Sequence, residues 1–175
     1  MTTLKTLPID ADQEEIKNLV VEWNELLAQE KYEEALELIL HDDTQKIDGK
    51  TWVWTPQKLE AAVFTYGLPW FTKADIKRLY GADSRVDYKV TSILNRPDKE
   101  KWLETIDIYI YDYAISPEMA RTWGITGLDY ENIIGDVLFG NVPLDGKASD
   151  LSALFWIVKV DEKNITLIFR ELHVM

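Results

Sequence analysis

The stretch Thr105-Ile-Asp-Ile-Tyr-Ile-Tyr-Asp-Tyr113 alternates apolar and polar side chains, and this alternation decides the fold class of the chain. A period of two is the period of a β-strand, whose successive side chains point to opposite faces of a sheet. One face carries three isoleucines that we expect to fill the core: Ile106, Ile108 and Ile110. The opposite face carries one carboxylate and three phenols: Asp107, Tyr109, Tyr111 and Tyr113.

Strand patterns extend from this stretch in both directions. Upstream, three apolar residues alternate with polar ones: Val86, Tyr88 and Val90. Downstream, three β-rich blocks follow: residues 132–139, 151–160 and 165–174. Asp145-Gly146 and the polar residues 161–164 are typical of the turns between them. Residues 116–129 are less regular, and Ser116-Pro117 can begin a short helix there.

Before residue 80 the apolar residues recur with a helical period instead. Asp12 followed by Glu15 predicts an N-cap with its capping-box partner. Two apolar stripes follow, on two helices with a tight joint at residues 29–31: Ile16, Leu19, Val20, Trp23 and Leu27, then Tyr32, Ala35, Leu36, Ile39 and Leu40. Thr55-Pro56 predicts the start of a third helix, and Gly67 predicts its end.

Two shorter signals complete the order of elements. Asp48-Gly49 predicts a tight hairpin, and residues 75–80 predict one more short helix. Helices first and antiparallel strands last is the order of an α+β fold. We therefore expect three main N-terminal helices packed on one face of a curved antiparallel sheet, as a single domain over residues 1–175 in which residues 1–11 can be disordered. Trp23, at the centre of the first stripe, is expected to be buried against the sheet.

The chain is strongly acidic, with 31 Asp and Glu against 19 Lys and Arg and a net charge of −12. A field of this sign repels phosphate, so nucleic-acid binding and binding to anionic membranes are disfavoured. A cationic partner is compatible with this charge, although an acidic surface commonly serves solubility alone. The sequence contains no cysteine, which excludes disulfides, thiolate catalysis and cysteine-based zinc sites. The N-terminal residues have no leader-like pattern and no apolar run reaches about 18 residues, so we expect a cytoplasmic protein.

The element order resembles the nuclear transport factor two-like superfamily, also called ketosteroid isomerase-like or SnoaL-like. The segments that carry the resemblance are the helix pair of Trp23 and Tyr32-Glu-Glu-Ala-Leu36, then Asp42-Asp43, then Trp52-Val-Trp-Thr-Pro56, and a final strand that reaches the C-terminus. The resemblance covers residues 14–174, although residues 116–129 form a longer loop than this superfamily usually has. Residues 146–175 resemble a small bacterial branch to which no activity is attached.

That resemblance implies a cone-shaped, cystatin-like fold in which a bent sheet wraps around three helices and encloses a pocket. Some members of the superfamily carry out acid–base chemistry on hydrophobic substrates in this pocket. Others only bind ligands or dimerise, so the fold does not fix the function.

Three residues are candidates for a catalytic role. Asp107 shares a strand face with the tyrosines, and a carboxylate beside phenols in an apolar pocket can act as a general base. Asp112 lies at the strand end on the isoleucine side and is a second candidate for the pocket acid. His173 lies two residues after Glu171, on the same strand face, and this pair can also act as a base. The two histidines are too few and too distant to predict a metal site.

We expect five aromatic residues to line a ligand pocket: Trp54, Tyr66, Tyr109, Tyr111 and Trp156. The tyrosine face can instead be an outer surface, because no helix of this chain was expected to cover it, and it would then form a homodimer. The predicted function is that of a non-enzymatic binding or interaction domain for a small hydrophobic ligand, without a cofactor. Two alternatives stay open, a pocket isomerase or dehydratase with a carboxylate base, and an immunity-type protein that neutralises a basic partner.

Overall fold

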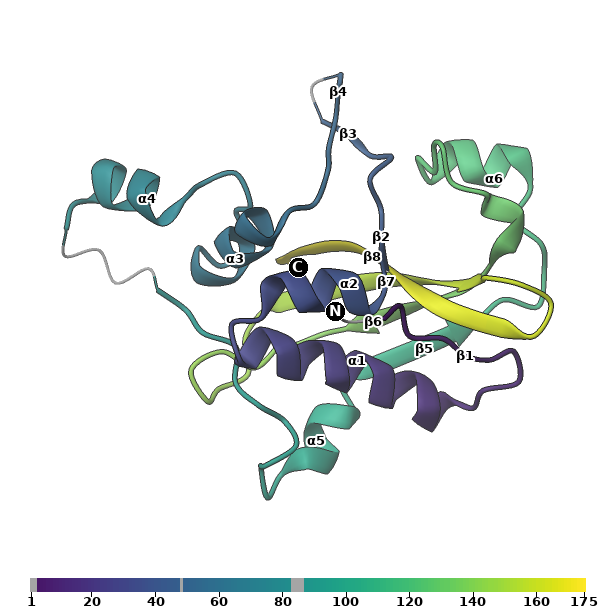
Figure 1. Cartoon of the computed structure of the whole chain (residues 1–175), viewed down its shortest axis with the longest axis horizontal. Helices are drawn as coiled ribbons and strands as arrows, with labels where there is room; N and C mark the ends of the chain where they lie inside the picture. Colours follow the sequence, from purple (N-terminus) through teal and green to yellow (C-terminus); the bar gives the residue numbers. More distant parts are fainter. Residues whose placement is uncertain (1–2, 48, 83–86) are drawn as a thin grey trace.

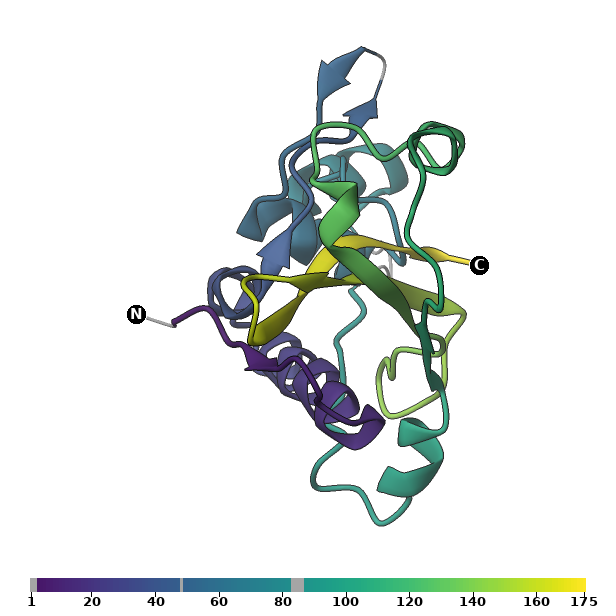
Figure 2. The same cartoon turned by 90° about the vertical axis from the view of Figure 1, so that its right-hand side faces the viewer.

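The computed structural model describes residues 3–47, 49–82 and 87–175 of the chain. In these residues six α-helices pack with a strongly curled, mainly antiparallel sheet, so the predicted α+β class is confirmed (Figures 1 and 2). Asp48 of the predicted hairpin and Val86 of the predicted upstream strand lie outside the described residues.

The helical half of the chain follows the capping signals in the sequence. Four helices come first: α1 (Gln13–Ala28), α2 (Tyr32–Leu38), α3 (Pro56–Phe64) and α4 (Lys73–Tyr80). The Asp12 carboxylate accepts a hydrogen bond from the Glu15 backbone N–H at 2.9 Å, and the Glu15 carboxylate accepts one from the Asp12 backbone N–H. Thr55 Oγ1 caps α3 by accepting a hydrogen bond from the Lys58 backbone N–H at 3.2 Å, and Gly67, with φ at +97°, follows its last turn. These contacts satisfy backbone groups that a helix end leaves unpaired.

Short elements connect the helices to the sheet. The predicted hairpin is present as β3 (Lys46–Ile47) and β4 (Lys50–Thr51). A further helix, α5 (Lys99–Leu103), was not predicted, because its single buried anchor, Trp102, gives no periodic stripe. Residues 87–89 form no strand, and Val90 makes only an isolated bridge to Leu144, so the prediction of a strand around residue 88 was wrong.

The sheet has the strand order β1-β8-β7-β6-β5. Its four long strands follow one another antiparallel: β5 (Ile106–Ile110), β6 (Ile133–Phe139), β7 (Leu151–Lys159) and β8 (Asn164–Val174). Two short strands share the outer edge of β8: β1 (Leu7–Pro8), which is antiparallel to it, and β2 (Leu40–His41), which is parallel.

Two bulges curl the sheet and change which side chains reach the core. One lies between Ile133 and Gly135 on β6, and the other is a register shift at Leu154/Phe155 of β7. Because Phe155 pairs with Phe169 and Leu154 pairs with Glu171, Arg170 is the extra residue of β8. A bulge of this kind bends the strand and redirects its side chains.

The main core lies between α1, α2, α3 and one face of the sheet. Trp23 is fully buried there, with its ring 5.2 Å from that of Phe155 and 5.1 Å from that of Phe169, as predicted. Ile106 and Ile108 face this core, whereas Ile110 is 48% exposed at the end of β5, so its assignment to the core was wrong. The space between α1 and the sheet is thus occupied by packed aromatic rings.

The opposite face of the sheet is covered in part by this same chain. Helix α6 (Pro117–Thr122) and the short 3₁₀ helix η1 (Tyr130–Asn132) lie on the far side of the sheet from α1 (Figure 2). A second, smaller cluster anchors them: Ile115, Ala120, Ile133, Trp156, Val158 and Ile168. The expectation that no helix covers the tyrosine face was therefore wrong, because the irregular residues 116–129 fold back over it.

Candidate functional site

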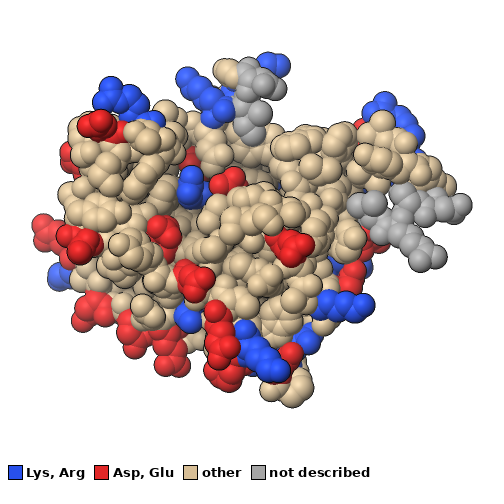
Figure 3. All heavy atoms as spheres, turned by 180° about the vertical axis from the view of Figure 1, so that it is seen from behind, with Lys and Arg blue, Asp and Glu red and all other residues tan. Residues whose placement is uncertain are grey.

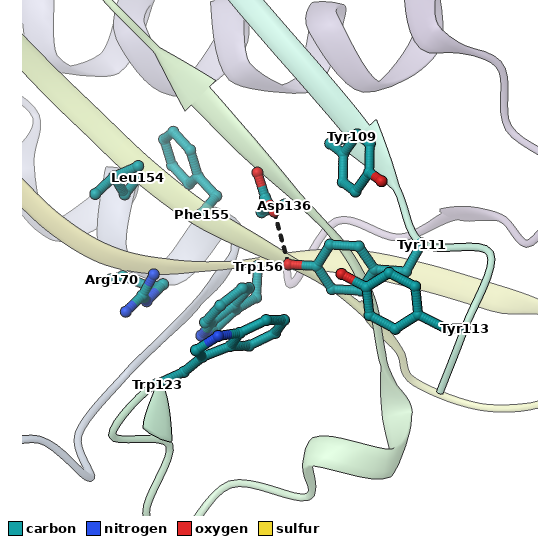
Figure 4. Close-up of a pocket in the computed structure, with 9 residues that line it drawn as sticks. All are labelled: Tyr109, Tyr111, Tyr113, Trp123, Asp136, Leu154, Phe155, Trp156 and Arg170. Atoms are coloured by element: carbon teal, nitrogen blue, oxygen red, sulfur yellow. Dashed lines mark hydrogen bonds between the residues drawn. The ribbon is translucent and has the colours of Figure 1, made fainter. Parts of the chain in front are cut away.

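A cavity of about 320 Å³ opens on the sheet face opposite α1, beside α6 (Figure 4). Strands β5 to β8 form its floor, and the end of α6 forms one wall. Nine residues line it: the aromatic residues Tyr109, Tyr111, Tyr113, Trp123 and Trp156, the charged residues Asp136 and Arg170, and Leu154 and Phe155, although the Phe155 ring itself packs against Trp23 on the other face. Seen from behind, the middle of the molecule is mostly uncharged, and acidic side chains gather toward its lower edge (Figure 3).

Two stacked pairs of rings form the walls of this cavity. Tyr111 and Tyr113 stack with their centroids 5.1 Å apart and their planes at 12°. Trp123 and Trp156 stack at 6.1 Å and 19°. Tyr111 and Trp123 meet at 6.0 Å, so the pairs join into one aromatic lining. Such a lining offers flat apolar surface to a ligand.

Local sequence explains how Trp123 reaches the cavity. Ser116 caps α6 by accepting a hydrogen bond from the Met119 backbone N–H, and Pro117 occupies the first helical position. The helix then ends at Thr122, Trp123 follows as its C-terminal cap, and Gly124, with φ at +68°, turns the chain back. The ring of Trp123 is therefore held over Trp156 by a capped turn of helix, while 37% of the residue stays exposed.

A carboxylate and a phenol form the polar contact of the site. The Tyr111 hydroxyl donates a hydrogen bond of 2.6 Å to Asp136 Oδ2. Burial, and next this hydrogen bond, raise the pKa of Tyr111 well above its ordinary value of about 10. Burial also raises the pKa of Tyr113, with the nearby Tyr109 as the next cause. Both phenols therefore stay protonated at neutral pH and serve as hydrogen-bond donors.

The second charge is Arg170, on β8. Its guanidinium carbon lies 4.1 Å from the centre of the Trp156 ring, a cation–π contact. The backbone carbonyl of Arg170 lies at the bulge and accepts hydrogen bonds from Trp54 Nε1 at 2.9 Å and Gln45 Nε2 at 3.1 Å. These two donors replace the ladder contact that the bulge removes, and they fix where the side chain begins.

The structure brings together three of the five residues assigned to the ligand pocket. Tyr109, Tyr111 and Trp156 line the cavity. Trp54 is buried on the other side of β8, where its ring packs against Phe169 and its indole N–H holds the bulge. Tyr66 lies elsewhere, next to Tyr88, and its hydroxyl accepts a hydrogen bond from the Asp150 backbone N–H.

The three catalytic candidates lie apart from one another and outside the cavity lining. Asp107 is exposed on β5 and pairs across the sheet with Leu138. Asp112 is exposed just after β5. His173 lies 3.5 Å from the Glu171 carboxylate, so these two share a face as predicted, near the C-terminal end of β8.

Six lining residues were not assigned to the pocket: Tyr113, Trp123, Asp136, Leu154, Phe155 and Arg170. Asp136 could have been found, because it is the one charged residue in the otherwise apolar strand Ile133–Phe139. Strand alternation also places Arg170 on the face opposite Phe169. Trp123 gave no usable signal, since its position depends on the irregular segment around α6.

Comparisons of the chain with protein-family models, with curated proteins and with solved structures give no match. Among the described residues, no helix combines the length and apolar character needed to cross a membrane. The same residues contain no group of three or more His, Asp or Glu arranged to hold a metal ion. The cavity must therefore be interpreted from its own side chains.

Replacing Tyr111 with phenylalanine is expected to weaken folding by about 1 kcal/mol, the typical net value of one hydrogen bond. It should also change the response to alkali. A phenol whose pKa is raised by folding stabilises the protein below its unfolded pKa of about 10, and this stability is lost as pH rises further. Urea unfolding between pH 8 and about 11 should show that the free energy of unfolding falls less steeply with pH in the variant than in wild type. An identical pH profile for both proteins would contradict this role for Tyr111.

Proposed function

We propose that this chain is a small-molecule binding domain whose ligand occupies the aromatic cavity on the sheet face opposite α1. The observation that carries the proposal is the convergence of five aromatic rings on one open cavity, from β5 and the residues just after it, from β7, and from the residue that caps the end of α6. Its volume of about 320 Å³ lies at the lower end of the range for small-molecule sites, so the ligand is small.

The composition of the lining supports binding of a flat, mainly apolar ligand. The Tyr111–Asp136 pair supplies an orienting polar contact at one side, and stacked rings supply the rest. Exposed aromatic surface of this extent is costly to leave in water and usually marks an interaction site. We infer a role in binding without catalysis, because the candidate catalytic residues Asp107, Asp112 and His173 lie outside the lining.

One contact favours an enzymatic alternative. Asp136, and not Asp107, is the carboxylate beside phenols in the cavity, at 2.6 Å from the Tyr111 hydroxyl. A carboxylate in this position can accept a proton from a substrate, with the phenols as hydrogen-bond donors. Turnover of any bound compound that disappears in Asp136→Asn while binding persists would favour the enzyme over the binding domain.

The family and the assembly stay proposals. Helices followed by a curled antiparallel sheet support a place in the nuclear transport factor two-like superfamily, although the cavity lies on the face away from α1. A homodimer would use the exposed residues around the cavity, Tyr109, Tyr113 and Trp123. The acidic edge of the molecule supports the immunity-type alternative with a basic protein partner (Figure 3).

The binding proposal is tested by ligand-observed NMR with a mixture of small aromatic compounds. Trp123→Ala should lower the affinity for the compounds that bind by roughly three- to tenfold, which corresponds to the loss of one aromatic contact. Trp70→Ala is the matched control, because Trp70 is 56% exposed and lies outside the cavity. Compounds that bind wild type, Trp123→Ala and Trp70→Ala equally well would show that the cavity is not the site.

A further inference from the structure

Arg170 has no carboxylate partner among the described residues, although the protein is strongly acidic. Within the described residues no carboxylate lies within ion-pairing distance of its guanidinium, and its Nε is buried without a hydrogen-bond partner. The chain carries 31 acidic residues, so the lack of an ion-pair partner for Arg170 does not follow from a shortage of carboxylates. Because Nε is buried, an incoming anion would pair with the terminal nitrogens of the guanidinium, which no carboxylate of the described residues occupies.

The side chain is also held in place. The bulge at Leu154/Phe155 sets Arg170 apart from the ladder, and Trp54 and Gln45 bind its carbonyl oxygen. The ring of Trp156 then supports the guanidinium at 4.1 Å. Such a preorganised guanidinium loses little freedom on binding, and its planar fork of donors matches the paired oxygens of a carboxylate or a similar acid group.

Asp136, the other charged residue of the cavity, does not form an ion pair with Arg170. Asp136 lies on β6, directly across from Trp156 on β7, while Arg170 lies on β8. Neighbouring strands are about 4.8 Å apart, so the two charges begin roughly 10 Å from each other with Trp156 between them. Asp136 is occupied by the Tyr111 hydroxyl. The aromatic surface thus extends from a carboxylate that is hydrogen-bonded to Tyr111 at one end to the Arg170 guanidinium, which has no carboxylate partner among the described residues, at the other.

We propose that the ligand of this cavity is a small aromatic anion, whose acid group binds the Arg170 guanidinium while its ring lies among Trp156, Trp123 and Tyr111. This proposal rests on the binding function proposed above and specifies the chemical class of its ligand. The net charge of −12 opposes the approach of any anion, so selection for one requires the local cation.

Two fluorescent dyes that share the same rings separate the acid group from the rings. Anilinonaphthalene sulfonate carries one acid group, and phenylnaphthylamine carries none. Wild type should bind the sulfonate more tightly than the neutral dye. Arg170→Gln should lower the affinity for the sulfonate roughly tenfold or more, which corresponds to the loss of a hydrogen bond to a charged group, and should change the affinity for the neutral dye by less than about twofold. Lys58→Gln is the matched control, because Lys58 also lies over a tryptophan, Trp52, at 4.0 Å, but outside the cavity.

The other possible results distinguish between the two proposals, the anionic ligand and the binding site in the cavity. Suppose that Trp123→Ala weakens binding of both dyes, but the two dyes bind wild type with equal affinity or lose affinity equally in Arg170→Gln. This result would contradict the proposal that the ligand is an anion, and it would still support a binding site in the cavity. Dye binding that is unchanged in Trp123→Ala would overturn both. Arg170→Lys, which keeps the charge and loses the fork, should fall between wild type and Arg170→Gln for the sulfonate, so the proposal stays testable even if the glutamine variant folds poorly.

Discussion

Replacing Trp23 with alanine should lower the free energy of unfolding by about 3–5 kcal/mol, the range for large aromatic truncations in a core. Trp23 is fully buried between α1 and the sheet, and its ring meets Phe155 edge-on at 5.2 Å and Phe169 at 5.1 Å. Those rings belong to two neighbouring strands that pair with each other, so they cannot both collapse into the space that alanine leaves.

A second substitution separates the ring from its polar atom. The Trp23 indole N–H is buried without a hydrogen-bond partner, so Trp23→Phe removes an unsatisfied donor together with part of the ring and should cost much less than alanine. Trp70→Ala, at an exposed position, should leave the unfolding midpoint nearly unchanged. Chemical denaturation of the three variants measures this order, and a Trp23→Ala midpoint close to wild type would show that α1 does not pack as described.

Gly135→Ala is expected to cost about 3 kcal/mol, at the upper end of the range for overpacking. A Cβ at Gly135 would lie 2.4 Å from the Tyr109 carbonyl oxygen and 3.1 Å from Ile157 Cδ1. The first contact is with backbone, so β5 must move away from β6. Because β5 carries Tyr109 and leads into Tyr111, the same change should also weaken ligand binding in the cavity.

Gly140→Ala is the control for this substitution. A Cβ at Gly140 would lie 3.6 Å from the Thr105 carbonyl oxygen, an ordinary van der Waals contact. It should therefore be tolerated within about 0.5 kcal/mol, the usual range for a substitution without a named conflict. Thermal and urea unfolding of the two alanine variants compare them directly, and equal stabilities would mean that β5 and β6 do not approach closely at Gly135.

Local signals in the sequence were sufficient for most of the fold. The capping box at Asp12, the Thr55-Pro56 helix start and the alternation around Ile108 each act within a few residues, so they could be recognised without the tertiary structure. Trp23 was correctly placed in the core because its stripe is long and regular. Tyr109 and Tyr111 were correctly placed on the far face of the sheet for the same reason.

The parts that were missed depend on contacts between distant segments. Strict alternation from Phe169 would place Glu171 in the core and Leu172 outside, but the bulge at Arg170 reverses this, and Leu172 is buried. The sequence of β8 alone does not predict that bulge, because the hydrogen bonds to the Arg170 carbonyl oxygen come from Trp54 and Gln45, over a hundred residues away. The position of Trp123 likewise depends on how α6 docks on the sheet.

Whether the cavity beside α6 binds the ligand can be read from the indole N–H signals of the seven tryptophans. A heteronuclear NMR titration with anilinonaphthalene sulfonate, assigned with single Trp→Phe variants, follows each indole separately. If the dye occupies the cavity, the signals of Trp123 and Trp156 should shift, while those of the core residues Trp23 and Trp102 stay fixed. Shifts confined to Trp52 and Trp70, or no shift at Trp123 and Trp156 when the dye is bound, would show that the ligand site lies elsewhere.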